Sequence, residues 1–365
     1  MPQLPPVLKE LVSKIQLPAA FSPKKPQKIA APKICLACDF GKSKIVFLEV
    51  EKSDQGIKLL KFQKIPRPVE KEKDSAALNS AFENGKYNSR KVRISVKGQG
   101  VIIRFVQFPQ MKPEELRNAI SFEIDQYIPF KSHEVIWDFH ILEENLPIAS
   151  GAGMNVLLSA VKRDELYATL KIFQEAGLEV ELIDVDALAA INALNFFYPE
   201  RLQNPAAILD IGTEISTLSV AHLGKPRFIR DISFGGLDIL KRLKRKLGLS
   251  QEQALQQIEV DQAPTPEATD ILKEALGDLV TDLKVSLNYY LDQTSGATAV
   301  KQLFVGGGGG YHPIVTEILK NSLGFEVEAM DVLGKVQIAP EIDAVMLRKN
   351  QGLLPVSLGL LIRSI

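Results

Sequence analysis

Two stretches of this 365-residue chain follow one pattern, which limits the fold more than any other feature of the sequence. Each is an apolar strand-like run that ends in Asp-x-Gly, passes through a turn with a hydroxyl side chain, and continues as a second strand-like run. The first copy covers 34–50 and the second covers 207–220. A glycine turn between two strands is typical of a β-hairpin. Because the copies lie far apart in the chain, we predict two similar lobes that face one cleft.

The paired turns are suited to holding the phosphates of a nucleotide. Glycine lets backbone N–H groups approach phosphate oxygens, and the hydroxyl groups of Ser43 and Thr213 can add donors. Asp39 and Asp210 can hold a hydrated Mg²⁺ without lying directly on the anionic phosphates. For either Asp-x-Gly copy alone, a tight turn without a ligand is an equally simple explanation. Two copies in matching strand contexts favour the nucleotide site.

The composition permits this architecture. Hydrophobic residues make up 45% of the chain and charged residues 24%, which suits about two or three domains with sizeable cores. Lysine plus arginine equals aspartate plus glutamate at 44 each, so bulk charge does not suggest a nucleic-acid partner. No apolar stretch reaches the roughly 18 residues of a membrane span, and the N-terminus does not look like a signal peptide. We expect a cytoplasmic protein.

Cysteine and histidine do not indicate a separate site. Cys35 and Cys38 form C-x-x-C, but redox pairs of this spacing normally open a helix. Here both cysteines lie in a predicted strand, where positions i and i+3 point to opposite faces, so we expect buried thiols. The four histidines lack metal-ligand spacing. We therefore predict no metal beyond a nucleotide-bound Mg²⁺.

The regions around the hairpins suggest a division of the chain. A proline- and lysine-rich N-terminal segment is predicted to be a flexible arm. After Pro109 the pattern changes to a compact set of strands and helices, which we interpret as an insertion in the first lobe. The predicted units are the arm at 1–32, the first lobe at 33–105, 182–204 and 346–365, the inserted module at 106–181, and the second lobe at 205–345.

Five consecutive glycines at 306–310 form a third candidate element of the site. They lie between a predicted strand at 300–305 and a predicted helix at 313–323. Such a run allows a flat or anionic ligand to approach the backbone closely. A flexible loop is the alternative explanation, but the regular flanking elements favour a binding loop.

The order of these motifs resembles that of the actin-like ATPase superfamily. More closely, the sequence resembles the PilM family of type IV pilus assembly. The resemblance extends over about residues 33–365 and lies in the order of many moderate motifs. Further segments that carry it are 107–130, 175–178, 228–236 and 357–363.

The resemblance implies an α/β protein with an actin-like (ribonuclease H-like) fold of two lobes and a small inserted α+β module. Proteins of this family bind ATP between the lobes and bind the short cytoplasmic tail of the membrane protein PilN. That implies a cytoplasmic scaffold that is peripheral at the inner membrane. By position, Asp39 and Asp210 would serve Mg²⁺. The implied nucleotide contacts are Asp39, Gly41, Lys42 and Ser43 in the first turn, Asp210, Gly212 and Thr213 in the second, and Gly307, Gly308 and Gly309 in the glycine loop.

The first turn departs from the usual pattern of the family, Asp-Ile-Gly-Ser-Ser-Ser-Ile-Lys. Lys42 and Lys44 replace serines, and Val46 stands where the lysine would be. An Ala-Glu-x-x-Lys pattern expected near the adenosine is not found at 254–258. We therefore expect weaker or rearranged contacts to adenine and phosphate.

Two other functions on the same fold stay open. A kinase of sugars or small acids needs a base beside the acceptor hydroxyl, and Asp186 is the candidate catalytic residue. A helix-capping role explains Asp186 equally well. A polymerising relative of the FtsA type is the other alternative. Because only Asp186 offers itself to position an attacking water, we expect at most a slow ATPase.

Overall fold

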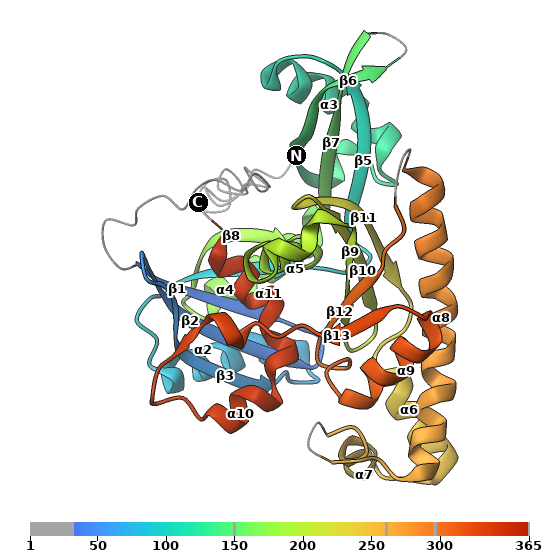
Figure 1. Ribbon diagram of the computed structural model, residues 1–365. Coiled ribbons are helices and arrows are strands. Elements are labelled where there is room, and N and C mark those ends of the chain that lie inside the picture. The colour runs from blue at the N-terminus through green and yellow to red at the C-terminus, as the bar shows by residue number, and fades with distance from the viewer. Residues whose placement is uncertain (1–32, 149–150, 260–261, 295–297, 364–365) are drawn as a thin grey trace.

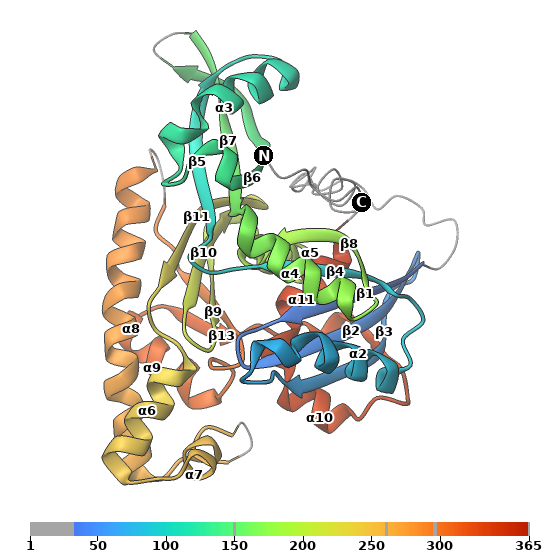
Figure 2. The same ribbon diagram turned by 180° about the vertical axis from the view of Figure 1, so that it is seen from behind.

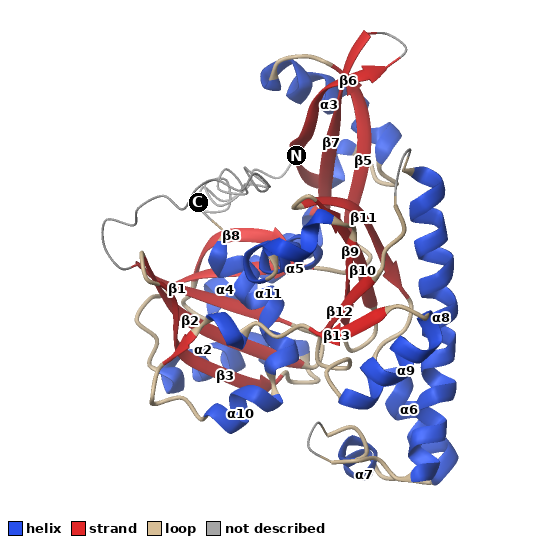
Figure 3. Ribbon diagram, in the orientation of Figure 1, coloured by secondary structure: helices blue, strands red, loops and turns tan. Residues whose placement is uncertain are grey.

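The computed structural model describes residues 33–148, 151–259, 262–294 and 298–363 (Figure 1). The predicted N-terminal arm at 1–32 lies outside the described residues. Three separate sheets with surrounding helices make up the described chain (Figure 3). Within these residues, no helix is both long enough and apolar enough to cross a membrane.

A six-stranded mixed sheet forms the centre of the first lobe. In spatial order its strands are β14 (Gln337–Ile338), β3 (Gly56–Pro66), β2 (Lys44–Ser53), β1 (Lys33–Phe40), β4 (Lys91–Val96) and β8 (Glu179–Val185). The helices on one face are α2 (Asp74–Gly85) and α4 (Arg163–Glu175), and those on the other are α5 (Asp186–Phe197) and α11 (Leu354–Ile362).

The side chains of β1 point alternately to the two faces of the sheet, which shows why the sheet needs helices on both sides. Residues 35–39 are all buried, because successive side chains enter different cores. Cys35 packs in the core of α5 and α11, whereas Cys38 packs in the core of α2 and α4. Both thiols are free and buried, as predicted from their spacing in a strand.

The second lobe contains a five-stranded sheet. Its strands, in spatial order, are β11 (Lys225–Ile232), β10 (Ser216–His222), β9 (Ala206–Ile211), β12 (Gln302–Gly306) and β13 (Glu326–Ala329). The helices on its outer face are α6 (Gly236–Leu247), α8 (Pro266–Gln293) and α9 (Pro313–Leu323). Helix α5 contacts the other face of this sheet as well as the first sheet, so one apolar helix joins the two lobes (Figures 1 and 2).

The inserted module is a three-stranded antiparallel sheet with one helix across it. The sheet has the order β5 (Val101–Pro109), β7 (Gly151–Lys162) and β6 (Val135–Ile148), and α3 (Pro113–Tyr127) packs on it. Leu116, Ile120 and Ile124 recur at one-face spacing in α3 and contact the sheet. Pro113 begins the helix at a position where its missing N–H costs nothing. The module extends away from the two lobes (Figure 2).

The module occupies a different range from the predicted 106–181. Its sheet already begins with Val101, because β5 pairs with β7 from its first residue. Helix α4 and the first three residues of strand β8, which the prediction placed in the module, belong to the first lobe. The apolar face of α4, with Leu166, Leu170 and Phe173, lies in the core that β1, β2 and α2 share, and α4 contacts β8. An amphipathic helix reveals its apolar face in the sequence but not the sheet that the face contacts.

Three short or edge elements complete the described fold. They are α7 (Gln251–Gln256), α10 (Ala344–Lys349) and β14. Strand β14 pairs with β3 of the first sheet, so the chain returns to the first lobe before residue 345, where the predicted second lobe ended. Ser250 accepts a hydrogen bond from the backbone N–H of Gln253 and caps α7.

Candidate nucleotide site

The two Asp-x-Gly turns meet between the lobes. The hydroxyl groups of Ser43 and Thr213, from the β1–β2 and β9–β10 turns, lie 2.8 Å apart and share a hydrogen bond. Beside them, Lys42 Nζ lies 3.5 Å from a carboxylate oxygen of Glu214. The structure therefore places the two predicted phosphate turns opposite each other. A ligand held between them has to replace this direct contact.

The glycine loop after β12 packs against the second turn. Gly309 donates its N–H to the carbonyl of Ile211 at 2.9 Å, and Gly307 donates to the carbonyl of Gly352 at 2.7 Å. Gly307 has φ 83°, and a Cβ added there would lie 2.6 Å from Asp210 Oδ1. A side chain at this position is excluded by both the backbone conformation and the space. The loop is therefore a fixed backbone surface rather than a flexible connection.

Three carboxylates and one lysine converge behind the turns. Asp39 and Asp210 are the next-to-last residues of β1 and β9, and Asp186 is the first residue of α5. Lys97 Nζ lies 2.5 Å from Asp186 Oδ2 and 3.4 Å from Asp39 Oδ1. Lys97 was not among the site residues predicted from the sequence. Since β4 runs parallel to β1, the residue after β4 had to reach the same edge of the sheet as Asp39, and this could have been noticed.

The pKa values of these groups reflect burial and mutual attraction. Burial raises the pKa of Asp210 to about 6, although Lys97 works in the opposite direction. Burial likewise raises the pKa of Asp186, against the effect of Lys97. Burial alone would lower the pKa of Lys97, but the carboxylates of Asp186, Asp39 and Asp210 raise it well above its usual value. Lys97 is therefore a permanent cation within the acidic cluster.

The arrangement fits a protein-bound Mg²⁺ poorly. The carboxylate of Asp39, one of the two predicted metal residues, faces the ammonium of Lys97. Within the described residues, no group of three or more His, Cys, Asp or Glu side chains is placed to hold a metal ion. A fixed ammonium competes with a divalent cation for the same oxygens. The metal roles predicted for Asp39 and Asp210 thus gain no support from this geometry.

Asp186 lies in the cluster, but not as the sequence suggested. Asp186 is only 4% exposed, and its carboxylate is paired with Lys97. Val185, not Asp186, is the N-cap of α5, and no side chain caps this helix end. The capping explanation is therefore not supported. The catalytic role stays a prediction, and an ion pair with lysine weakens a carboxylate as a base.

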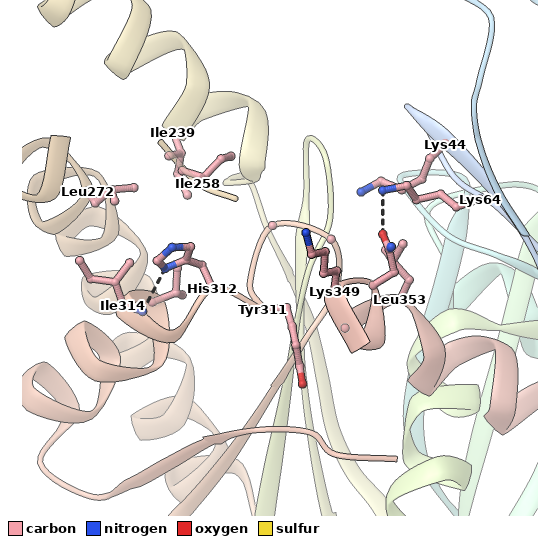
Figure 4. Close-up of a pocket in the computed structure, with 16 residues that line it drawn as sticks. Lys44, Lys64, Ile239, Ile258, Leu272, Tyr311, His312, Ile314, Lys349 and Leu353 are labelled. Atoms are coloured by element: carbon pink, nitrogen blue, oxygen red, sulfur yellow. Dashed lines mark hydrogen bonds between the residues drawn. The ribbon is translucent and has the colours of Figure 1, made fainter. Parts of the chain in front are cut away.

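A cavity of about 160 Å³ lies beside the glycine loop, between the lobes (Figure 4). Lys44 and Lys64 of the first lobe lie on one side, and Lys349 lies near Tyr311 between the two sides. The other side comes from the second lobe, where His312 lies among the apolar residues Ile239, Ile258, Leu272, Ile314 and Val315. Typical ligand pockets measure roughly 300–1,000 Å³, so a nucleotide would require the lobes to separate slightly.

The lining of this cavity carries positive charge, and the acids that act on Lys44 and Lys64, namely Asp39, Asp210 and Glu259, lie outside the lining. None of the described residues that line it is acidic. Lys64 donates to Asn350 Oδ1 at 2.7 Å, whereas Lys44 makes no hydrogen bond or ion pair with a described residue. Burial lowers the pKa of Lys44, and so does the neighbouring Lys64, while Asp39 and Asp210 oppose the shift. These features are typical of a site that receives an anion.

A second cavity, of about 250 Å³, lies where the module meets both lobes. Strand β5 of the module, the start of α5 and strands β10 and β11 contribute to it. Ile103 and Arg104 line it from the module, and Arg230 and Asp231 from the second lobe. Lys97 lines this cavity and also pairs with Asp39 of the first turn. It therefore lies between the cavity and the phosphate turns.

The module is also tied directly to the second lobe. Arg227 of β11 lies 2.7 Å from Glu143 of β6, and Asn155 donates to the same carboxylate at 2.9 Å. The hydrogen bond from Arg227 lowers the pKa of Glu143 to about 2, against the effect of burial. The sequence analysis placed the module within the first lobe alone. The structure shows that its position also depends on the second lobe.

Comparison with known proteins agrees with this architecture. The family described as type IV pilus assembly protein PilM matches residues 37–365. A chain of the solved PilM-PilN type IV pilus biogenesis complex is 22% identical, with a TM-score of 0.78 over 90% of this chain and 98% of that one. The ethanolamine utilization protein EutJ from Carboxydothermus hydrogenoformans is 15% identical, with a TM-score of 0.53 over 92% and 91%. These likenesses confirm the predicted actin-like fold.

Proposed function

Because this chain belongs to the family of the type IV pilus assembly protein PilM, we propose that it is an ATP-binding, actin-like scaffold of the pilus assembly platform. The observation that carries the proposal is the meeting of three separate loops beside one cavity, which the glycine loop and Lys44 line. The two Asp-x-Gly turns come from different lobes, and the glycine loop packs on the second turn. Beside them lies a cavity with one cationic and one apolar side, which suits phosphates and a base.

In this proposal the phosphates lie between the turns and the base lies against the apolar side. Gly41 then supplies a backbone donor, and Ser43 and Thr213 supply hydroxyl donors, as predicted. The N–H of Gly212 is donated to the carbonyl of Ile215 at 3.1 Å within its own turn. Gly308 and its neighbours let the base and ribose approach the backbone. A side chain at Gly308 would enter the space of Lys44 Nζ and the cavity itself.

A thermal-shift experiment tests nucleotide binding. A ligand that binds only the folded state raises the melting temperature. Millimolar ATP should raise that of the wild type, and Gly308→Val should abolish the increment. Gly277→Ala is the matched control, because nothing lies within 4 Å of a Cβ added at this exposed helix position. If the wild type shows no increment, the cleft does not bind ATP.

We propose that turnover is slow or absent. Asp186 is the base predicted from the sequence, and its pairing with Lys97 at 2.5 Å disfavours proton abstraction from water. A scaffold needs the nucleotide to fix the angle between the lobes more than to supply chemical work. Hydrolysis near the median enzyme rate of about 10 s⁻¹ would contradict this proposal.

We also propose that the chain receives the cytoplasmic tail of a PilN-type membrane protein, and so lies in the cytoplasm at the inner membrane. The solved relative was determined as a PilM-PilN complex, and the fold match supports carrying that pairing over. Strands β5 and β6 are both edges of the module's sheet and could each pair with an extended peptide. The second cavity opens at the base of β5, so we place the tail against the module and the adjacent lobes.

A peptide titration tests this placement. A synthetic N-terminal peptide of a PilN-type protein should bind the full chain, and Ile103→Arg in the second cavity should weaken binding at least tenfold. Phe122→Ser is the matched control, because Phe122 lies on the outer face of α3 and is 88% exposed. Equal binding by wild type and Ile103→Arg would remove this cavity from the peptide site. A lack of binding by any form would refute the partner proposal.

A further inference from the structure

We propose that Lys44 and Lys64 are a built-in counter-charge for the nucleotide, so that the cleft binds nucleoside diphosphates and triphosphates alike without needing a divalent metal ion. In this arrangement the two ammonium groups contact the phosphates nearest to the ribose. The inference rests on the proposed nucleotide site, because it states how that site recognises its ligand.

Strand geometry places both lysines on one surface. Lys44 and Val46 are two residues apart in β2, so their side chains point to the same face of the sheet. Lys64 of β3 is the direct partner of Val46 in the antiparallel register. Directly opposed residues also share a face. Val46 is fully buried, and the two lysines flank it on the face that borders the cavity.

Lys44 is prepared for an anionic partner. Its ammonium makes no hydrogen bond or ion pair with any described residue, and burial and Lys64 lower its pKa while the more distant Asp39 and Asp210 oppose the shift. Keeping an ammonium in a partly buried place without a partner is costly, and a second lysine beside it adds repulsion. An anion bound between Lys44 and Lys64 would remove both penalties. Figure 4 shows the two side chains next to each other on one side of the cavity.

The opposite side of the cavity orients the ligand. It is mainly apolar, with His312 as its one polar side chain among the described residues, so the base of a nucleotide is expected there, and Ile239, Leu272 and Ile314 lie across the cavity from Lys44 and Lys64 in Figure 4. Gly308 of the glycine loop lies next to Lys44, because a Cβ added to it would overlap Lys44 Nζ. A ribose on this loop puts its first phosphates next to Lys44. The terminal phosphate of a triphosphate then lies farther along, toward the Ser43–Thr213 contact.

The acidic residues behind the turns do not supply the missing cation site. Lys97 already pairs with Asp186 and Asp39, and none of the described residues lining the cavity is acidic. Positive charge for the phosphates therefore comes from lysine side chains. Because these contacts involve the phosphates common to ADP and ATP, removal of the terminal phosphate should cost little affinity.

The experiment is a calorimetric titration of the full-length protein with ADP and with ATP, each in excess EDTA and in Mg²⁺. For the wild type, the four dissociation constants should agree within about threefold, a difference of under 1 kcal/mol. Lys44→Met and Lys64→Met should each weaken ADP binding in EDTA at least tenfold, about 1.4 kcal/mol. Lys44→Arg keeps the charge and should stay within about threefold of the wild type.

A lysine outside the cavity serves as the matched control. Lys58→Met removes a lysine from the same strand as Lys64. This variant should bind ADP like the wild type. Circular dichroism and melting curves establish that each variant is folded.

The outcomes separate this inference from the proposed function. If the wild type binds nucleotide but Lys44→Met and Lys64→Met bind ADP equally well, the inference is wrong and the proposed function stands. A wild type that loses more than tenfold in EDTA, or that prefers ATP to ADP more than tenfold, also overturns the inference alone. A wild type that binds neither nucleotide overturns both.

Discussion

Replacing Lys97 by methionine should destabilise the protein, because it leaves a buried carboxylate without its partner. Asp186 is 4% exposed, and Lys97 Nζ lies 2.5 Å from its Oδ2 atom. Breaking a fully buried ion pair by removing one partner costs roughly 3–5 kcal/mol. The side chain of Lys97 is 39% exposed, which allows some solvent screening. We therefore expect Lys97→Met to lower the free energy of unfolding by about 2 kcal/mol.

Urea denaturation at pH 7.5, followed by circular dichroism, measures this loss. The double variant Lys97→Met with Asp186→Asn removes the charge that the single variant leaves behind. It should recover to within about 1 kcal/mol of the wild type. A double-mutant cycle then gives the coupling between the two residues. The reasoning is refuted if Lys97→Met loses less than about 0.5 kcal/mol, or if the double variant is no more stable than the single one.

Three further predictions concern pH and thiols. The pKa of Asp210, about 6 in the folded protein, lies above its ordinary value, so its contribution is favourable below about pH 4 and is lost as pH rises through 6. The free energy of unfolding of Asp210→Asn should thus rise relative to that of the wild type as the pH is raised from 4.5 to 7.5. A difference between the two proteins that does not change with pH would contradict this. The pKa of Glu143 is lowered to about 2 by Arg227, so its stabilisation is present above about pH 4.5 and declines below it. In Glu143→Gln the urea midpoint should therefore fall less steeply as the pH is lowered below about 4.5 than it does in the wild type. An equally steep fall in both proteins would contradict this. Because Cys35 and Cys38 are buried on opposite faces of β1, a thiol reagent should find neither in the native protein and both in urea, and rapid native labelling would contradict this.

Local pattern and motif spacing were sufficient for the architecture of the cleft. The Asp-x-Gly turns appear in the sequence as interruptions between strand-like runs, and two copies require two lobes. A shared ligand would require both turns to meet, and in the structure Ser43 contacts Thr213. The glycine run could likewise be interpreted from its regular flanks, and it packs on Ile211.

What the sequence could not reveal depends on contacts between distant segments. Helix α4 has an obvious apolar face, but only the folded chain shows that this face covers the first sheet rather than the module. Strand β14 has two residues and is defined by its partner β3 alone. Lys64 looks like an ordinary exposed lysine until the β2–β3 register places it opposite Val46, beside Lys44. Such residues reach the site through the pairing of strands, which cannot be predicted from a local sequence pattern.

A crystal structure with ATP tests the central claim most directly. Our account predicts a nucleotide between the lobes, with phosphates separating Ser43 from Thr213 and reaching Lys44, and with the base against Ile239 and Leu272. The angle between the lobes should be wider than in the present structure, because the cavity of about 160 Å³ is too small for a nucleotide. A nucleotide bound at another place, or a cleft that stays closed and empty at saturating ATP, would contradict the account.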